Sequence, residues 1–195
     1  MWGSQQAEAA SVIVSVTRLR LRSWRHVAGF ARHTAASLGQ AVISEGFVDG
    51  RLLAGPGLTF WTVTRWSSED AMRRWRSAGA HGRAMPFLAE WCDEASVARW
   101  KQPDGARFPT WQDCGRRMAG EGRASRVRQP SDAQGAGAAP EPPPGWGRRL
   151  VLPLRRLGVV KRRVVPEGER GCRAGSRGEG QSASRHRDDA KREPS

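Results

Sequence analysis

The stretch that decides the fold runs from residue 59 to residue 100 and opens with Thr59–Trp66, TFWTVTRW. This segment is rich in aromatic and β-branched residues, which are typical of β-strands. Successive side chains of a strand point to opposite faces, so the alternation predicts two sets that face opposite ways. The first set is Phe60, Thr62, Thr64 and Trp66, and the second is Trp61, Val63 and Arg65.

Helix-forming sequence follows this strand at once, and we expect a helix over Ser68–Ala78. Ser67 is placed to cap it, with Asp70 at the reciprocal position of a capping box. Gly79 is a residue type that commonly ends a helix. A short connection then leads to Pro86, which is suited to the first position of a second helix that runs to Cys92.

Working outward from this stretch, we expect three further strands and one further helix. They are a strand over Ser11–Leu21, a helix over Ser23–Gly39, a strand over Gly46–Ala54 and a last strand over Ala95–Lys101. Gly55, Pro56 and Gly57 form a turn that pairs the second strand with the third as a hairpin. The basic end of the first strand, with Arg18 and Arg20, is expected in solvent because arginine is mostly exposed.

The predicted order β-α-β-β-α-β places the chain in the α+β class. It is satisfied by the ferredoxin-like arrangement, an antiparallel four-stranded sheet with both helices on one face. The opposite face of the sheet is then bare, and an exposed apolar patch of that size marks an interface or a ligand groove. We therefore predict a homodimer in which two such faces cover each other.

Composition divides the chain of 195 residues unevenly. Residues 1–115 carry a net charge of +4 and residues 116–195 a net charge of +10, and Trp146 is the one aromatic residue after Trp111. A segment with few large apolar groups cannot offset the entropy of ordering its backbone. We predict a folded domain over residues 11–101, a polar extension over 102–132, and a disordered basic tail rich in Gly, Pro and Arg over 133–195.

Several classes of protein receive no support from the sequence. Its three cysteines form no CxxC pair, which favours free thiols in a reducing compartment. We find no secretory signal and no apolar run of the length that spans a bilayer, so a cytoplasmic location is expected. No motif of a serine hydrolase, a zinc protease or a P-loop or dinucleotide-binding protein occurs, and no metal site is expected.

The core of the chain resembles the dimeric α+β barrel superfamily, which includes antibiotic-biosynthesis-monooxygenase-like proteins. The resemblance rests on residues 60–64, Trp66, residues 69–72, AHGRAMP at residues 80–86 and AEWC at residues 89–92. The same pattern is similar to spheroidene monooxygenase, a carotenoid oxygenase of related fold that is associated with haem. The resemblance covers residues 11–101 and implies oxygenase-type chemistry on a small apolar substrate.

His81 is the candidate catalytic residue. An imidazole at this place can act as a general acid or base, or as an axial ligand of haem, and the resemblance is what favours these roles. The alternative is an exposed histidine in a loop. Gly82 would let the backbone approach a ligand closely, because glycine has no side chain.

A ligand pocket is proposed around His81. Its candidate residues are Trp61, Arg65, Trp66, Arg83 and Trp91. The tryptophans would form apolar walls, and the arginines would orient an anionic or oxygenated ligand. Plain core packing of the tryptophans and a solvated pair of arginines are the alternatives.

The basic segment over residues 148–165, RRLVLPLRRLGVVKRRVV, alternates apolar runs with pairs of basic residues. It could contact nucleic acid or an anionic membrane through its charge. The alternative is an extension without function. For the protein as a whole, we expect a small-ligand-binding protein of the monooxygenase-like type, or else a non-catalytic module that dimerises through its sheet.

Overall fold

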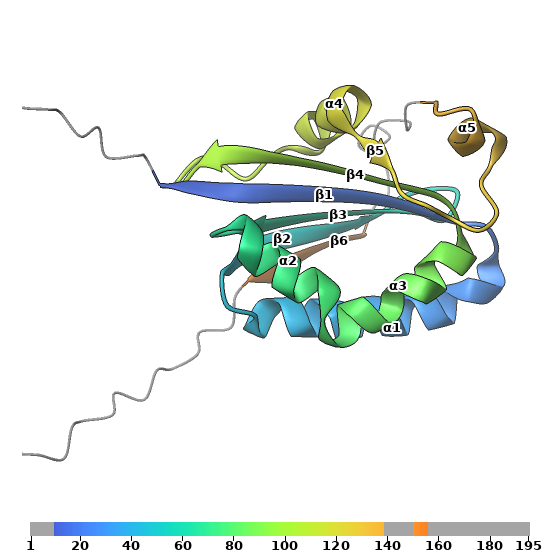
Figure 1. Ribbon diagram of the computed structural model, residues 1–195, viewed down its shortest axis with the longest axis horizontal. Coiled ribbons are helices and arrows are strands. Elements are labelled where there is room, and N and C mark those ends of the chain that lie inside the picture. The colour runs from blue at the N-terminus through green and yellow to red at the C-terminus, as the bar shows by residue number, and fades with distance from the viewer. Residues whose placement is uncertain (1–9, 139–149, 156–195) are drawn as a thin grey trace, which may run out of the picture. The chain divides into compact units, whose positions relative to one another are not determined.

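The computed structural model describes residues 10–138 and 150–155. All of them lie in the first of two units into which the chain divides, Met1–Val160. An antiparallel sheet carries helices α1, α2 and α3 on one face and α4 on the other (Figure 1).

The first seven long elements follow the predicted order. They are β1 (Ser11–Leu21), α1 (Val27–Ile43), β2 (Phe47–Ala54), β3 (Thr59–Trp66), α2 (Glu69–Ser77), α3 (Gly79–Trp91) and β4 (Cys92–Pro103). The four strands lie in the order β4-β1-β3-β2, all antiparallel. This is the ferredoxin-like arrangement, so the predicted fold class is confirmed.

The chain then adds elements that the sequence did not predict. They are α4 (Trp111–Glu121), β5 (Arg123–Ala124), α5 (Asp132–Gly135) and β6 (Leu150–Arg155), besides the short 3-10 helix η1 (Trp24–His26) before α1. β5 extends the sheet beyond β4 and β6 extends it beyond β2, which gives six strands. Residues 150–155 were expected in the disordered tail, whereas here they pair with β2. The rest of that tail lies outside the described residues, apart from the segment up to residue 138.

The face of the sheet under α1, α2 and α3 buries one set of the alternating side chains. Trp66 packs there against Phe47 and Met72, and Phe47 and Trp66 meet edge to face at 5.2 Å between ring centroids. Ile13 of β1 contributes from the neighbouring strand. The predicted facing of the two sets in β3 is therefore confirmed, since Trp66 packs here and Trp61 and Val63 pack in another cluster.

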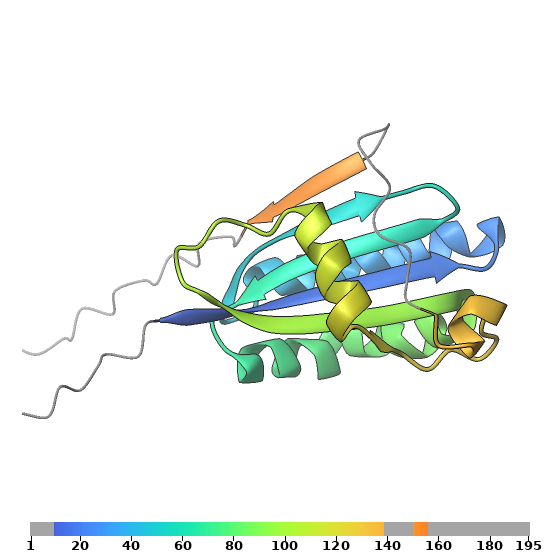
Figure 2. The ribbon, with the colours of Figure 1, turned by 90° about the horizontal axis from the view of Figure 1, so that it is seen from above.

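The opposite face of the sheet is not bare, because α4 lies across it (Figure 2). Cys114 and Met118 of α4 are fully buried against Trp61 and Val63 of β3. Thr110 and Asp113 form the capping box that starts this helix. We predicted a homodimer because we expected this face to be uncovered, and that expectation is wrong. Dimerisation therefore stays a prediction without that support.

Three local differences affect the site. α1 continues four residues past the expected stop, to Ile43. Ser68, one residue later than expected, caps α2 through a hydrogen bond of 3.2 Å from the Ala71 N–H to its hydroxyl oxygen. α3 begins at Gly79 and continues through Pro86, which is exposed and forfeits one N–H···O bond to the preceding turn.

The basic end of β1 was expected in solvent, but Arg18 is 4% exposed. Its guanidinium lies 2.5 Å from a carboxylate oxygen of Glu94 on the neighbouring strand β4. Arg20 adds a bidentate pair with Asp93, at 2.9 Å for both bonds. The Ser131 hydroxyl also donates to Glu94, at 2.9 Å, so this buried cluster attaches the segment before α5 to the sheet.

Candidate functional site

A cavity of about 190 Å³ lies between the sheet and helices α1, α2 and α3. Its floor consists of short side chains on the helix-facing side of the two central strands. They are Ser15 and Thr17 of β1 and Thr62 and Thr64 of β3. Protein interiors are close-packed, but these short side chains do not fill the space between the middle of the sheet and the helices. The cavity therefore follows from the sequence of the two central strands.

The remaining walls are mainly apolar. They are built by Phe30 and Leu38 of α1, Met72 and Trp75 of α2, Ala84 and Leu88 of α3, and Val97 of β4, among others. Apolar walls with a few polar groups are typical of sites for small molecules. The hydroxyl groups on the floor supply those polar groups.

His81 lines this cavity from the first turn of α3. Its backbone N–H donates to Oε1 of Gln40 at 2.9 Å, and its ring lies 4.0 Å from the ring of Trp75. Gly79 makes the tight passage from α2 possible, because its φ is +58° and a Cβ there would lie 2.7 Å from the Gln40 side chain. The contact with Gln40 thus fixes the start of α3 and the position of the imidazole.

The tautomer of His81 follows from its second contact. Nδ1 lies 2.9 Å from the carbonyl oxygen of Arg76, which can only accept a hydrogen bond. Nδ1 therefore carries the proton in the neutral ring, and Nε2 carries the lone pair. Burial lowers the pKa of His81 below its ordinary value of 6.5, against the opposing effect of the bond to Arg76. The ring is neutral near pH 7 and Nε2 is available as a base.

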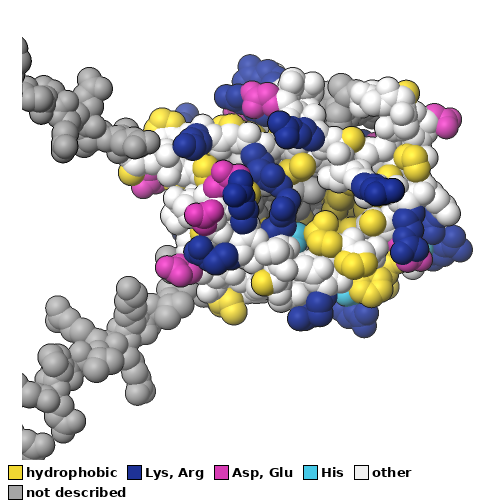
Figure 3. Space-filling model, viewed as in Figure 1, with side chains coloured by type: hydrophobic (Ala, Val, Ile, Leu, Met, Phe, Trp, Pro, Cys, Tyr) yellow, Lys and Arg dark blue, Asp and Glu magenta, His cyan; other side chains and the backbone are white. Residues whose placement is uncertain are grey.

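Three exposed arginines line the cavity, Arg76 of α2, Arg99 of β4 and Arg126. In residues 10–138 and 150–155, no ion pair involves any of the three guanidinium groups. Burial lowers the pKa of Arg99, and repulsion from Arg76 lowers it further. On the face that carries α2 and α3, Lys and Arg side chains gather beside a group of hydrophobic ones (Figure 3). These arginines therefore favour a ligand with a negatively charged or strongly polar end.

None of the five predicted pocket residues lines this cavity. Trp61 and Arg65 face the α4 side of the sheet, where Arg65 pairs with Asp49 at 2.6 Å. Trp66 is fully buried in the core beside α2, and Arg83 is exposed on α3. Trp91, at the end of α3, stacks on His26 at 5.7 Å. The sequence places all of them near one another along the chain, but alternation and helix geometry direct them to different surfaces.

For His81 the structure corrects the predicted surroundings. His81 lies in a helix, not in a loop, and its cavity opens on the helix-covered face, not on the face expected to be bare. Gly82 does not face a ligand either, since a Cβ there would lie 2.8 Å from the carbonyl oxygen of Ser77. Gly82 instead allows α2 and α3 to approach closely.

Sequence reasoning did not single out the hydroxyl residues of the floor or the arginines that line the cavity. The signal for the floor was present, because four short polar residues occupy adjacent inward positions of two strands predicted to pair. Nothing local indicated Arg76 and Arg99, which are 23 positions apart in the chain. Only the tertiary structure brings β4 next to α2.

Haem does not fit this cavity. An apolar cavity of about 150 Å³ holds one benzene ring, and four linked pyrrole rings need far more space than the 190 Å³ present here. His81 lines this restricted volume, and its Nδ1 is already bonded to the Arg76 carbonyl. We therefore assign no role to haem.

The buried thiols are also poorly suited to chemistry. Burial raises the pKa of both Cys92 and Cys114 to about 12, so neither forms a thiolate at neutral pH. Within the described ranges, no three His, Cys, Asp or Glu side chains group as a metal site would require. No helix among the same residues has the length and apolar character to span a membrane.

Comparisons with known proteins bear on the fold. The sequence matches no protein-family model and no curated protein. Among solved structures, the chain is similar to a conserved protein from Methanosarcina mazei, with 15% identity, a TM-score of 0.43, and coverage of 47% of this chain and 92% of that one. It is similar to SnoaB, a cofactor-independent oxygenase from Streptomyces nogalater, with 18% identity, a TM-score of 0.39, and coverage of 52% and 100%.

An anthrone oxidase-like protein also matches, with 10% identity, a TM-score of 0.40, and coverage of 77% of this chain and 93% of that one. All of these matches lie below 25% identity and below a TM-score of 0.5, so they show neither a superfamily nor an activity for this chain. A shared fold of this kind hosts many functions, so the activity must be argued from the cavity itself.

Proposed function

We propose that this protein binds a small, mainly apolar ring compound in the cavity beneath α1, α2 and α3, and that it oxygenates this compound with His81 as the general base. The observation that carries the proposal is the imidazole of His81 in the wall of a mainly apolar cavity, with Nδ1 2.9 Å from the Arg76 carbonyl oxygen, which leaves Nε2 without a proton when the ring is neutral. The resemblance found in the sequence suggested the class of reaction.

The size of the cavity limits the ligand. At about 190 Å³ it exceeds the roughly 150 Å³ that accommodates benzene, so a compound of one or two rings fits. The hydroxyl groups of Thr62 and Thr64 can bind a carbonyl or hydroxyl oxygen on such a ring. Arg76 and Arg99 stabilise negative charge that develops near them, because ionised donors form stronger hydrogen bonds than neutral ones.

The reaction that suits these groups begins with removal of a proton from an activated methylene carbon by Nε2 of His81. The resulting carbanion adds dioxygen, and loss of water from the hydroperoxide leaves a ketone. The balance is R₂CH₂ + O₂ → R₂C=O + H₂O. The carbon supplies all four electrons that dioxygen takes up, so the overall reaction requires no further reductant.

A two-ring ketone with a doubly activated methylene, 2-indanone, tests the proposal. Isothermal titration should show binding to the full chain, and an oxygen electrode should show uptake with indane-1,2-dione as the product. His81→Gln should reduce uptake by about a hundredfold or more, as expected for loss of a general base, while binding changes little.

The matched control is His26→Gln. His26 lies outside the cavity lining, and its ring stacks on Trp91 at 5.7 Å between ring centroids, so its replacement should leave uptake nearly unchanged. Binding without uptake would support the non-catalytic alternative, a simple binding module. Absence of binding would refute the cavity as a ligand site.

A further inference from the structure

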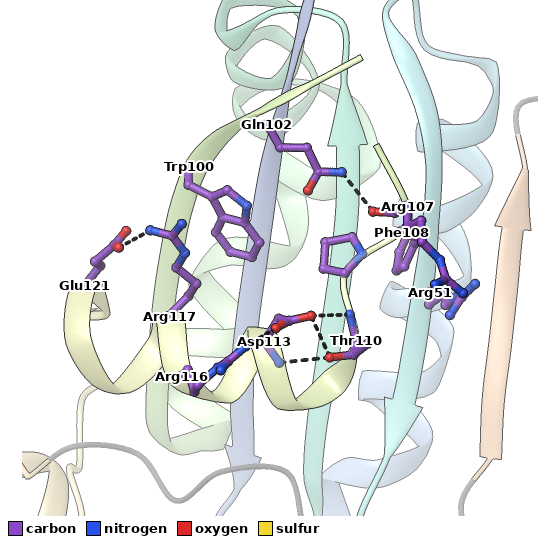
Figure 4. A pocket seen from close by; sticks show the side chains of 11 residues that line it. Arg51, Trp100, Gln102, Arg107, Phe108, Thr110, Asp113, Arg116, Arg117 and Glu121 are labelled. Atoms are coloured by element: carbon purple, nitrogen blue, oxygen red, sulfur yellow. Dashed lines mark hydrogen bonds and ion pairs between the residues drawn. The ribbon is translucent and has the colours of Figure 1, made fainter. Parts of the chain in front are cut away.

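A second hollow lies on the other face of the sheet, independent of the cavity beneath α1, α2 and α3. This groove has a volume of about 820 Å³ and is open to solvent. Its walls come from β2, β4, the loop after β4 and α4. Trp100 of β4 and Phe108 of the loop stand on opposite sides of it, with Gln102 at one end and Thr110 and Asp113 of the α4 start at the other (Figure 4).

The walls of this groove are held in place before any ligand arrives. The loop is fixed by a bond of 3.1 Å from the Gln102 amide to the Arg107 carbonyl and by one of 2.9 Å from Arg65 to the Ala106 carbonyl. The capping box of Thr110 and Asp113 fixes the start of α4. The backbone of these walls therefore needs no ordering when a ligand binds, and the entropy cost falls on exposed side chains such as Arg107.

Charge in the groove is positive and only partly neutralised. Arg116 pairs with Asp113, and Arg117 pairs with Glu121. Arg51 and Arg107 form no ion pair within the described parts of the chain. The groove therefore has two arginines available to an anion.

The aromatic side chains lie next to these charges. The guanidinium carbon of Arg51 lies 4.2 Å from the ring centroid of Phe108, and that of Arg117 lies 5.5 Å from the ring centroid of Trp100. Aromatic rings combined with arginines are how proteins hold an unpaired nucleotide, by stacking on the base and contacting the phosphate. A carboxylate has one charge, whereas a terminal phosphate has nearly two and matches the two available arginines.

We propose that this groove binds a nucleotide, with the base against Trp100 and the phosphate on Arg51 and Arg107. The sequence contains no phosphate-binding motif, and the site arises because the tertiary structure brings β2, β4 and α4 together. A base and an anionic phosphate occur both in a free nucleotide, whose terminal phosphate carries nearly two charges, and in a single strand, whose phosphodiester groups carry one each. The test therefore includes both.

Titrations of the full chain with AMP and with a single-stranded oligodeoxyadenylate of six nucleotides test the proposal at low and moderate salt. The double variant Arg51→Gln/Arg107→Gln should weaken binding about tenfold or more, as should Trp100→Leu through loss of stacking. The matched controls are Arg74→Gln/Arg83→Gln, which removes the same charge from exposed sites on α2 and α3, and Trp24→Leu, which removes a tryptophan that is 77% exposed. Both controls should change binding less than twofold.

Each outcome decides the proposal. Binding of AMP with this pattern identifies a free nucleotide, and binding of the oligomer alone with this pattern identifies a single strand. Equal losses in the groove variants and the controls would show attraction by general charge and overturn the proposal, as would no binding of either probe. Circular dichroism melting of each variant shows whether it is folded, and Trp100→Phe, which keeps a stacking ring, should retain most of the binding if Trp100→Leu fails to fold.

Discussion

At the scale of single residues, hydrogen-bond partners decide what His81 and Arg18 can do. The Arg76 carbonyl fixes the tautomer of His81, and burial keeps its ring neutral. Glu94 allows Arg18 to be buried, because a buried charge without a partner is very costly. In both cases the partner is supplied by a different turn or strand, and the residue type alone does not reveal it.

The lowered pKa of His81 predicts how stability depends on pH. The unfolded chain takes up a proton near pH 6.5, whereas the folded chain does so at lower pH, so protonation favours unfolding. The contribution of His81 to stability is fully present above pH 6.5 and is lost as the pH falls through the lowered pKa. Urea unfolding at pH 7.5 and pH 5 should show a smaller difference for His81→Gln than for the parent chain, and an equal difference would contradict the assigned burial.

Removal of the Glu94 charge should destabilise the protein strongly. Glu94→Gln leaves Arg18 buried without a carboxylate, which costs about 3–5 kcal/mol for a buried pair. Chemical denaturation measures the loss. The control Glu69→Gln breaks an exposed pair with Arg73 and should cost less than about 0.5 kcal/mol. Similar values for both variants would mean that the Arg18–Glu94 pair is solvated in the folded protein.

At the scale of elements, the two faces of the sheet differ in how they are covered. α4 packs on one face, whereas a space remains between the other face and helices α2 and α3. α4 fills one face with Cys114 and Met118, and short hydroxyl side chains leave the other face hollow. The two faces therefore provide different sites, a mainly apolar cavity beneath the helices and an open, basic groove on the other face.

The packing of α4 can be tested through Met118, which is 1% exposed. Met118→Ala should destabilise the chain by about 2–5 kcal/mol, because it removes a buried side chain and leaves a cavity. The control Met85→Ala, at a position 42% exposed on α3, should cost much less. Equal midpoints of thermal unfolding would show that α4 contributes little to the core.

Filling the cavity separates binding from stability. Ala84 is buried and lines the cavity, so the larger side chain of Ala84→Leu has room and should lower the affinity for 2-indanone at least tenfold with little loss of stability. Ala71 is equally buried but packed in the core, and Ala71→Leu should cost about 1–3 kcal/mol by overpacking. If Ala84→Leu bound the ketone as before, the cavity would not be the ligand site.

At the scale of the whole molecule, the folded unit extends beyond the predicted boundary at residue 101. Phe108 and Trp111 pack against the core, and the backbone of Ser125 and Arg128 bonds to residues of β4 and α3. Within the polar extension predicted over residues 102–132, α4 covers the face that was expected to dimerise, whereas Val127 packs on the helix-covered side with Leu21 and Phe30. The composition of the chain marks the end of the aromatic-rich region near Trp111. Composition does not show that the residues after 101 fold back onto the sheet.

Truncation tests the boundary. A chain ending after Lys101 exposes Trp61 and Val63 and should unfold or associate, whereas a chain ending after Val160 should melt within a few degrees of the full chain. Sedimentation and thermal unfolding of both chains measure these effects. A well-folded monomer ending at Lys101 would show that α4 is dispensable.

The sequence by itself determined the order of elements, the bounds of β1 and β3, and which side chains of each strand share a face. These features depend on local spacing, which is visible along the chain. It also selected His81 as a candidate, and the role of His81 stays a proposal. It did not determine α4 over the sheet, the partners of Arg18, or the meeting of Arg76 with Arg99, because these depend on contacts between distant segments. Only the tertiary structure decided where space remains between the layers, since a cavity depends on the volumes of all the side chains around it.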